Sequence, residues 1–304
     1  MKTWKDAFRC AALWMGLLTG TIGAQASQLL IPMDDDQSNH LKAYGLAFWL
    51  LEQEVEVEWL LNYRGGSFLL PNLTAAVEEC VIRGISHQVI ADVQAQQILL
   101  EIANPESNTE RVKLEVAPQI AVYSPDGKQP WDDAVTLVLT YAEIPYDIIY
   151  DQEIMSGALP VYDWLHLHHE DFTGQYGRFY RAFKNAPWYI EQKRDSEARA
   201  AALGFNKVSE AKRAVALKIR NFTLAGGFLF AMCSATDSYD IALAAQGVDI
   251  CEYMFDGDPA DPSAQSKLDY TQSYAFENFR LSMNPNEYEF SNIDATNSRP
   301  RKPE

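Results

Sequence analysis

Basic residues are scarce in this chain. The 304 residues include 25 Lys and Arg against 42 Asp and Glu, which gives a formal net charge of −17 at pH 7. Because a phosphate backbone and an anionic membrane surface both repel a protein of this charge, neither is expected as a partner. The composition therefore argues against nucleic-acid binding as the function.

Cysteine is also rare, with four residues in the whole sequence. Cys10 falls in an N-terminal stretch that is expected to be removed, which leaves Cys80, Cys233 and Cys251. Three cysteines are too few for a disulfide scaffold in a chain of this size, and an odd number leaves at least one free thiol. At least one of these thiols is therefore either buried and inert or reactive.

Long apolar runs are missing apart from one near the N-terminus. Residues 11–22 form an apolar run that is too short to span a bilayer comfortably, and the small-x-small pattern of residues 24–26 follows it. With the basic residues that precede it, this run predicts a secretory signal peptide over residues 1–26. The mature protein is then periplasmic or secreted, with no transmembrane segment. The alternative is a buried N-terminal helix or a membrane anchor.

What the chain does contain is an alternation of short apolar runs and helical patterns, with 47% of its residues hydrophobic. This alternation predicts an α/β fold with a doubly wound, mostly parallel sheet. We expect an N-terminal α/β half over residues 27–118 and a second α/β half over residues 119–251. Residues 252–304 are predicted to be loop-rich, and because no strand pattern there would close a sheet, we expect the chain to be truncated.

The strongest local signal surrounds Cys233. Gly226 and Gly227 end a helical pattern, residues 228–232 form a continuous apolar run typical of a central parallel strand, and the cysteine stands where the next helix begins. This is the pattern of a nucleophile elbow, which presents a side chain at the carboxyl edge of a sheet. The helix N-terminus would favour the thiolate, and its N–H groups could hold an oxyanion. The alternative is a small buried cysteine that ends a core strand.

A cluster of histidines stands at the end of another apolar strand. His166 and His168 would share one face of that strand, and His169 and Glu170 would lie at its carboxyl end. His166 and His168 could hold zinc or another divalent ion together with a carboxylate. Alternatively, His168, His169 or Glu170 could serve Cys233 as a base, or the histidines could simply hydrogen-bond neighbouring loops. Apart from such a metal, no cofactor is expected.

Two further stretches could contribute to binding. The backbone N–H groups of Arg64, Gly65, Gly66 and Ser67 could hold an anion or an oxyanion; the alternative is a glycine turn. An aromatic stretch that begins at Tyr176 could line a sugar- or peptide-binding cleft, or it could pack on the sheet as a lid.

Four stretches carry a resemblance to known proteins. They are HLKAYG at 40–45, WLLNYRGGS at 59–67, LHLHHEDFTGQ at 165–175 and FAMCSATD at 230–237. Together they resemble a group of exported bacterial proteins labelled asparagine synthetase B, over nearly all of the mature chain. The order of strands and helices over 120–245, ending in the cysteine elbow, is similar to the flavodoxin-like fold of class I glutamine amidotransferases. The resemblance implies that Cys233 is a nucleophile.

The chain departs from the amidotransferase pattern in its elbow and its base. Ala231 and Ala235 stand where that fold usually has glycine, and no histidine follows His169 to complete the usual triad. ATP-dependent asparagine synthesis is not supported either. Lys2 stands where that enzyme has its catalytic cysteine, and its Ser-Gly-Gly-x-Asp-Ser loop does not occur.

These motifs support two hypotheses. The first is an exported, cysteine-dependent amidohydrolase or amidotransferase with Cys233 as nucleophile. The second is a non-catalytic domain that uses the same crevice to bind a small molecule or a glycan. Under the first, the strands that precede His168 and Cys233 should be neighbours in the sheet. His168 or His169 should then lie within hydrogen-bonding reach of Cys233, directly or through a water.

Overall fold

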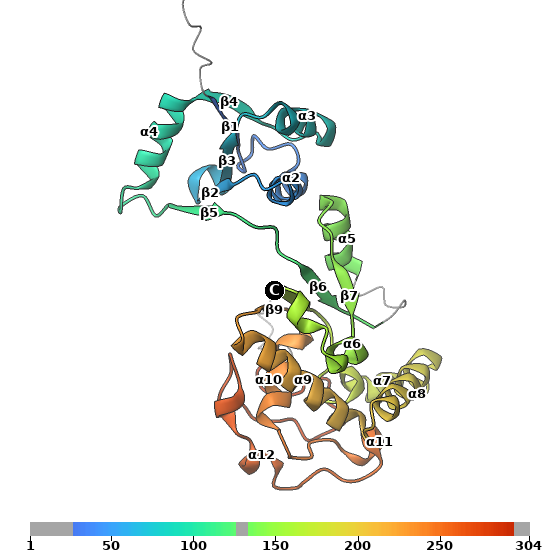
Figure 1. Cartoon of the computed structure of the whole chain (residues 1–304). Helices are drawn as coiled ribbons and strands as arrows, with labels where there is room; N and C mark the ends of the chain where they lie inside the picture. Colours follow the sequence, from blue (N-terminus) through green and yellow to red (C-terminus); the bar gives the residue numbers. More distant parts are fainter. Residues whose placement is uncertain (1–26, 126–132, 295–304) are drawn as a thin grey trace, which may run out of the picture. The chain divides into compact units, whose positions relative to one another are not determined.

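The computed structural model describes residues 27–125 and 133–294, which form two compact units (Figure 1). The first unit holds the described residues up to Ala117 together with Tyr141–Ile144, and the second holds the rest. The predicted signal peptide over residues 1–26 lies outside the described residues, as do the last ten residues of the predicted loop-rich segment.

The first unit contains an antiparallel sheet of five strands in the order β4-β1-β3-β2-β5. Helices α2 and α3 pack on one face of the sheet and α4 packs on the other. The prediction of a mostly parallel sheet is wrong for this unit. Only residues 62–66 separate β2 from β3, and a parallel pair needs a crossover of about a dozen residues or more. The elements are β1 (Ser27–Ile31), α2 (His40–Glu52), β2 (Val57–Leu61), η1 (Tyr63–Gly65), β3 (Ser67–Pro71), α3 (Thr74–Arg83), β4 (Gln88–Ala91), α4 (Asp92–Ile102) and β5 (Glu110–Leu114).

The second unit contains a parallel sheet of four strands in the order β7-β6-β8-β9, which confirms the prediction of an α/β fold with a parallel sheet here. Helices α6, α9 and α10 pack against one face of this sheet and form its core. The elements are β6 (Ile120–Tyr123), α5 (Asp133–Ala142), β7 (Asp147–Ile149), α6 (Asp151–Ser156), η2 (Leu159–Val161), β8 (Trp164–Leu167), η3 (Tyr176–Arg178), α7 (Tyr180–Phe183), α8 (Pro187–Ala202), α9 (Val208–Leu224), β9 (Phe228–Ala231) and α10 (Ser234–Ala244).

Strand β9 lies at the edge of this sheet, so the prediction of a central position for residues 228–232 is wrong. Leu229 and Ala231 face the helices and join the core, whereas Phe228 and Phe230 on the opposite side are 60% and 44% exposed. A continuous apolar run is typical of a strand that is buried on both faces. Here the same pattern belongs to a strand with only one buried face. A continuous apolar run therefore does not show whether one face of a strand is buried or both.

The segment after α10 builds a second core with α8 and with the N-terminal end of α9. It consists mainly of loops around α11 (Tyr253–Asp256), α12 (Ala264–Lys267) and η4 (Tyr270–Gln272). Buried side chains of this core include Tyr189, Val208, Ile241, Cys251, Phe255, Phe279, Leu281 and Phe290. Within the described part of the chain, none of the helices has the length and apolar character needed to cross a membrane.

Candidate functional site

A cavity of about 760 Å³ lies at the carboxyl ends of β8 and β9 in the second unit. His169 and Glu170 line it from the segment after β8, and Cys233 and Ser234 line it from the segment after β9. Parallel strands bring the loops at their carboxyl ends to one edge of the sheet, where ligands commonly bind. The predicted adjacency of the two strands is confirmed, and it places Cys233 in the same cavity as His169 and Glu170.

Cys233 has an unusual backbone conformation. It stands between β9 and α10, where it is the N-cap residue, with φ 52° and ψ −138°. This combination lies close to a region that residues other than glycine rarely occupy, and such residues cost of order 1–3 kcal/mol each. A strained, sharp strand-to-helix turn is the geometry that lifts a nucleophile out of a sheet edge. The backbone thus forms an elbow although alanine replaces glycine at 231 and 235.

Hydrogen bonds from both sides hold the elbow in place. The N–H of Met232 donates to the Leu167 carbonyl at 3.0 Å, and the N–H of Ala235 donates to the His168 carbonyl at 3.1 Å. The Ser234 hydroxyl donates to the His169 carbonyl at 2.8 Å. The histidine segment and the cysteine turn therefore form one hydrogen-bonded structure, and neither can move without the other.

The three cysteines of the described chain differ in exposure. Cys233 is exposed, whereas Cys80 and Cys251 are buried. Burial raises the pKa of the Cys80 thiol to about 11, and it also raises the pKa of Cys251. The alternative of a buried Cys233 is therefore wrong, and the two buried thiols are Cys80 and Cys251.

The predicted histidines lie in different surroundings. His169 lines the cavity, and the ring of His168 stacks on it with centroids 3.6 Å apart. His166 is only 4% exposed and stacks on Phe230, with its ring centroid 5.4 Å away. Burial lowers the pKa of His166 to about 4, so its imidazole is neutral near pH 7. His166 is not among the residues that line the cavity.

A buried ion pair at the cavity wall was not predicted. The Lys212 ammonium on α9 lies 2.9 Å from the Asp151 carboxylate and donates to the hydroxyls of Tyr123 and Tyr150 at 2.8 and 2.9 Å. Burial alone would lower the pKa of Lys212, but the Asp151 charge and these hydrogen bonds raise it. A sequence signal did exist, because Lys212 falls on the stripe of α9 that includes buried Val215.

Aromatic side chains form much of the remaining wall. Tyr176 and Phe179 line the cavity, which was one of the two alternatives for the aromatic stretch. Trp188 on α8 lines it as well. Tyr189 instead packs in the neighbouring core, where it is buried. The seven aromatic residues that line the cavity are Tyr150, Tyr176, Phe179, Phe183, Trp188, Tyr288 and Phe290.

Arg178 fixes the part of the wall that comes from the C-terminal segment. This arginine is buried and donates to the backbone carbonyls of Ser282 at 2.9 Å and Glu287 at 3.1 Å, and also to that of Asn284. Its own loop is held through Gln175, whose side-chain oxygen accepts from the same guanidinium. A planar group with five donors suits such a multiple contact. The Arg178 side chain therefore anchors residues that immediately precede the cavity-lining Tyr288.

Carboxylates also line the cavity, at Glu170, Asp171, Asp237, Glu289 and Asp294. Asp237 is only 5% exposed, and its side chain accepts the N–H of Ser238 in its own helix at 2.9 Å. Burial raises the pKa of Asp237 to about 6, and the charges of Asp294 and Asp171 add to this effect. The sequence pattern gave no reason to single out Asp237 from the other acidic residues.

The predicted loop of Arg64, Gly65, Gly66 and Ser67 belongs to the first unit. The Arg64 guanidinium is paired with the carboxylate of Asp34 at 2.6 Å and also with that of Asp36. A Cβ on Gly65 would lie 2.2 Å from a backbone oxygen, so the glycine permits close packing of two backbone segments. Ser67 is buried. These contacts favour the alternative of a structural glycine turn.

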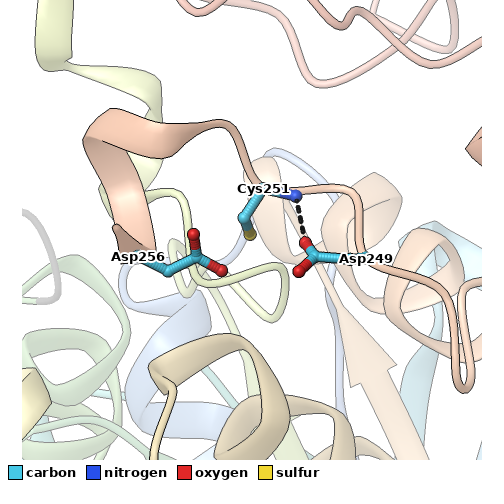
Figure 2. Close-up of side chains that lie close together, drawn as sticks. All are labelled: Asp249, Cys251 and Asp256. Atoms are coloured by element: carbon cyan, nitrogen blue, oxygen red, sulfur yellow. Dashed lines mark hydrogen bonds between the residues drawn. The ribbon is translucent and has the colours of Figure 1, made fainter. Parts of the chain in front are cut away.

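Figure 2 shows Asp249, Cys251 and Asp256, whose ligand atoms lie within 4.8 Å of one another, the one such group that the described residues contain. The ammonium of Lys207 already lies 2.7 Å from Asp249 and 3.2 Å from Asp256. The Cys251 thiol donates to a backbone carbonyl at 3.2 Å. A metal ion would have to displace the lysine and deprotonate a buried thiol, so the group is better explained as a lysine-centred ion cluster. The predicted histidine pair is not part of it.

Comparison of the chain with models of protein families, with curated proteins and with solved structures found no match.

Proposed function

We propose that the second unit is a cysteine-dependent acyl-transfer domain of the class I glutamine amidotransferase-like type, acting as an amidohydrolase or amidotransferase. The observation that carries this proposal is the backbone of Cys233, with φ 52° and ψ −138° at an exposed strand-to-helix turn that opens into a cavity. Residues with such a strained backbone cluster at active sites. A cysteine with a purely structural role would gain nothing from the strain. A resemblance of the motifs to exported proteins labelled asparagine synthetase B agrees with this type.

In the proposed reaction, the thiol proton of Cys233 passes to His169 or Glu170, directly or through a water, and Sγ forms a bond to the substrate carbonyl carbon. The carbonyl electron pair moves to the oxygen, which accepts from the Ser234 N–H at the start of α10. Collapse of this intermediate expels the amine, which takes the proton back. Water or a second amine then cleaves the thioester and restores the thiol.

The proposed setting of this reaction is outside the cytoplasm, after removal of residues 1–26. We do not propose ATP-dependent asparagine synthesis, because neither sequence motif of that enzyme occurs. The proposed reaction uses only side chains and backbone amides of the chain, so it assigns no role to a metal or other cofactor.

A second candidate function is ligand binding without catalysis, for a small molecule or a glycan. The observation that favours it is the cavity wall, where seven aromatic side chains offer a large stacking surface. The same cavity serves both candidates, and the fold does not decide between them.

Acylation by p-nitrophenyl acetate distinguishes the two candidates. We expect wild-type protein to release a burst of p-nitrophenolate equal to the protein concentration and to gain the mass of one acetyl group at Cys233. C233A should lose both signals, whereas C80A, which removes a buried thiol of the other unit, should retain them. If wild type and C233A react at the same slow rate and neither carries an acetyl group, the acyl-transfer proposal is wrong and the binding function remains.

A further inference from the structure

We infer that the cavity takes an amide substrate of peptide size that carries a positively charged nitrogen, and that Asp237 is the residue that selects for this charge. The inference rests on the proposed function in treating the ligand as the acyl donor. The size of the cavity, the placement of charge in it and the composition of its walls support the inference.

The size of the cavity favours a substrate larger than one amino acid. A volume of about 760 Å³ lies within the range of pockets that enclose drug-sized ligands and is several times the volume of one free amino acid. A single small amide would leave most of this space filled with water. The cavity therefore fits a substrate that extends over at least two residues of a peptide or an equivalent conjugate.

The charged residues that line the cavity favour a positively charged ligand. Among the described residues that line the cavity, Lys212 is the only Lys or Arg, and its charge is already balanced by Asp151 at 2.9 Å. Asp237 lines the same cavity and is 95% buried, and its carboxylate accepts the N–H of Ser238 from its own helix. Like charges of Asp171 and Asp294 act on it. A ligand cation would relieve this repulsion, whereas an anion would increase it.

The position of Asp237 also relates the cation to the reacting bond. Asp237 lies in the first turn of α10, Cys233 is the N-cap residue of the same helix, and both side chains line the cavity. The charged nitrogen of the substrate and the attacked carbonyl would therefore lie in one cavity.

Aromatic side chains form much of the cavity wall. Tyr176 in η3, Phe179 between η3 and α7, and Trp188 in α8 line the cavity. Aromatic faces attract ammonium and guanidinium groups and also cover the apolar stems that carry them. A carboxylate with such a wall suits a basic side chain better than it suits a neutral or acidic one.

The test measures binding to full-length C233A, so that it does not depend on catalysis. The probes are three N-acetylated dipeptide amides that contain tyrosine and differ at one position, which is lysine, its neutral analogue norleucine, or glutamate. By isothermal titration we expect the lysine peptide to bind about tenfold or more tightly than the norleucine peptide, as a charge-assisted hydrogen bond predicts. The glutamate peptide should bind most weakly.

Two matched variants assign the effect to Asp237. D237N in the C233A background should bring the lysine peptide to within about twofold of the norleucine peptide. D195N, which removes an exposed charge on α8, should keep the preference. Equal binding of the lysine and norleucine peptides to C233A overturns the inference even if D237N does not fold, and so does a preference that survives in D237N. Loss of Cys233 acylation with the lysine preference intact would instead overturn only the proposed reaction.

Discussion

The backbone N–H of Ala235 donates to the carbonyl of His168 at 3.1 Å, across the ends of two neighbouring strands. This bond joins the first turn of α10 to the histidine segment, so it fixes the direction of the helix that carries Asp237. It also uses one of the N–H groups that a helix N-terminus leaves without an intrahelical acceptor. Backbone bonds from Met232 and Ala235 thus help to set the position of Cys233, together with the bond of the Ser234 hydroxyl.

The strain at Cys233 can be measured by comparing two truncations. Because glycine tolerates positive φ and alanine does not, we expect C233G to be more stable than C233A by about 1–2 kcal/mol. Urea unfolding of the two variants gives the difference, and both should be equally unreactive toward p-nitrophenyl acetate. Equal stability of the two variants would contradict the strained backbone.

The buried carboxyl of Asp237 should make stability depend on pH. Its pKa in the folded protein, about 6, lies above the value of about 3.8 for an unperturbed aspartate, so the folded state holds the proton more tightly. The stability from this group is therefore complete below about pH 4 and is lost as pH rises through about 6. The loss is of order 2–3 kcal/mol.

Urea unfolding at several pH values tests this dependence. The stability of wild type relative to D237N should fall between about pH 4 and pH 6 and stay constant above it. D195N should follow the wild-type curve, because that residue is on the surface. A difference between wild type and D237N that does not change with pH would show that Asp237 is ionised in both states.

His166 should have the opposite dependence. Its pKa in the folded protein is about 4, below the usual 6.5, so the unfolded chain binds more protons between these values and stability rises with pH across this window. Its Nε2 is buried with no hydrogen-bond partner among the described residues, and its ring stacks on Phe230. We therefore expect H166F to be at least as stable as wild type near pH 7 and clearly more stable near pH 5, by thermal unfolding. A large loss of stability at pH 7 would mean that the imidazole nitrogen has a structural role.

The pair of Lys212 and Asp151 should behave as a coupled unit. Removing one partner leaves a buried charge without its counter-charge, so K212M and D151N should each lose about 3–5 kcal/mol of unfolding free energy. The double variant should lose clearly less than the sum of the two single losses. Additive losses in urea unfolding would show that the two groups do not interact in the folded protein.

Much of the second unit could be predicted from the sequence, because its strands are short apolar runs separated by helical patterns. The elbow at Cys233 could also be predicted, since the glycine pair, the apolar run and the cysteine are adjacent in the chain. The edge position of β9 could not be predicted, because a run such as Phe228–Ala231 does not reveal which of its faces is covered. In the first unit, the charged strand Glu110–Leu114 alternates too weakly to mark a strand.

The remaining site residues depend on distant partners. Lys212 meets Tyr123 and Asp151 at separations of 89 and 61 residues. Arg178 reaches carbonyls more than 100 positions further along the chain. The identity of these distant partners leaves no periodic signal, so only the folded arrangement shows that Lys212 pairs with Asp151 and that Arg178 supports the cavity wall.

Strand β9 is bonded to the sheet along one side only. The N–H groups of Phe228 and Met232 point to β8 and its flanking residues, with bonds of 2.8 and 3.0 Å to the carbonyls of Asp163 and Leu167. Because N–H groups alternate along a strand, those of Leu229 and Ala231 point to the open edge. These outer amides should exchange with deuterium long before those of β6, without any opening of the sheet. Cys233 thus follows an edge strand whose outer amides exchange while the inner bonds that hold the elbow stay closed.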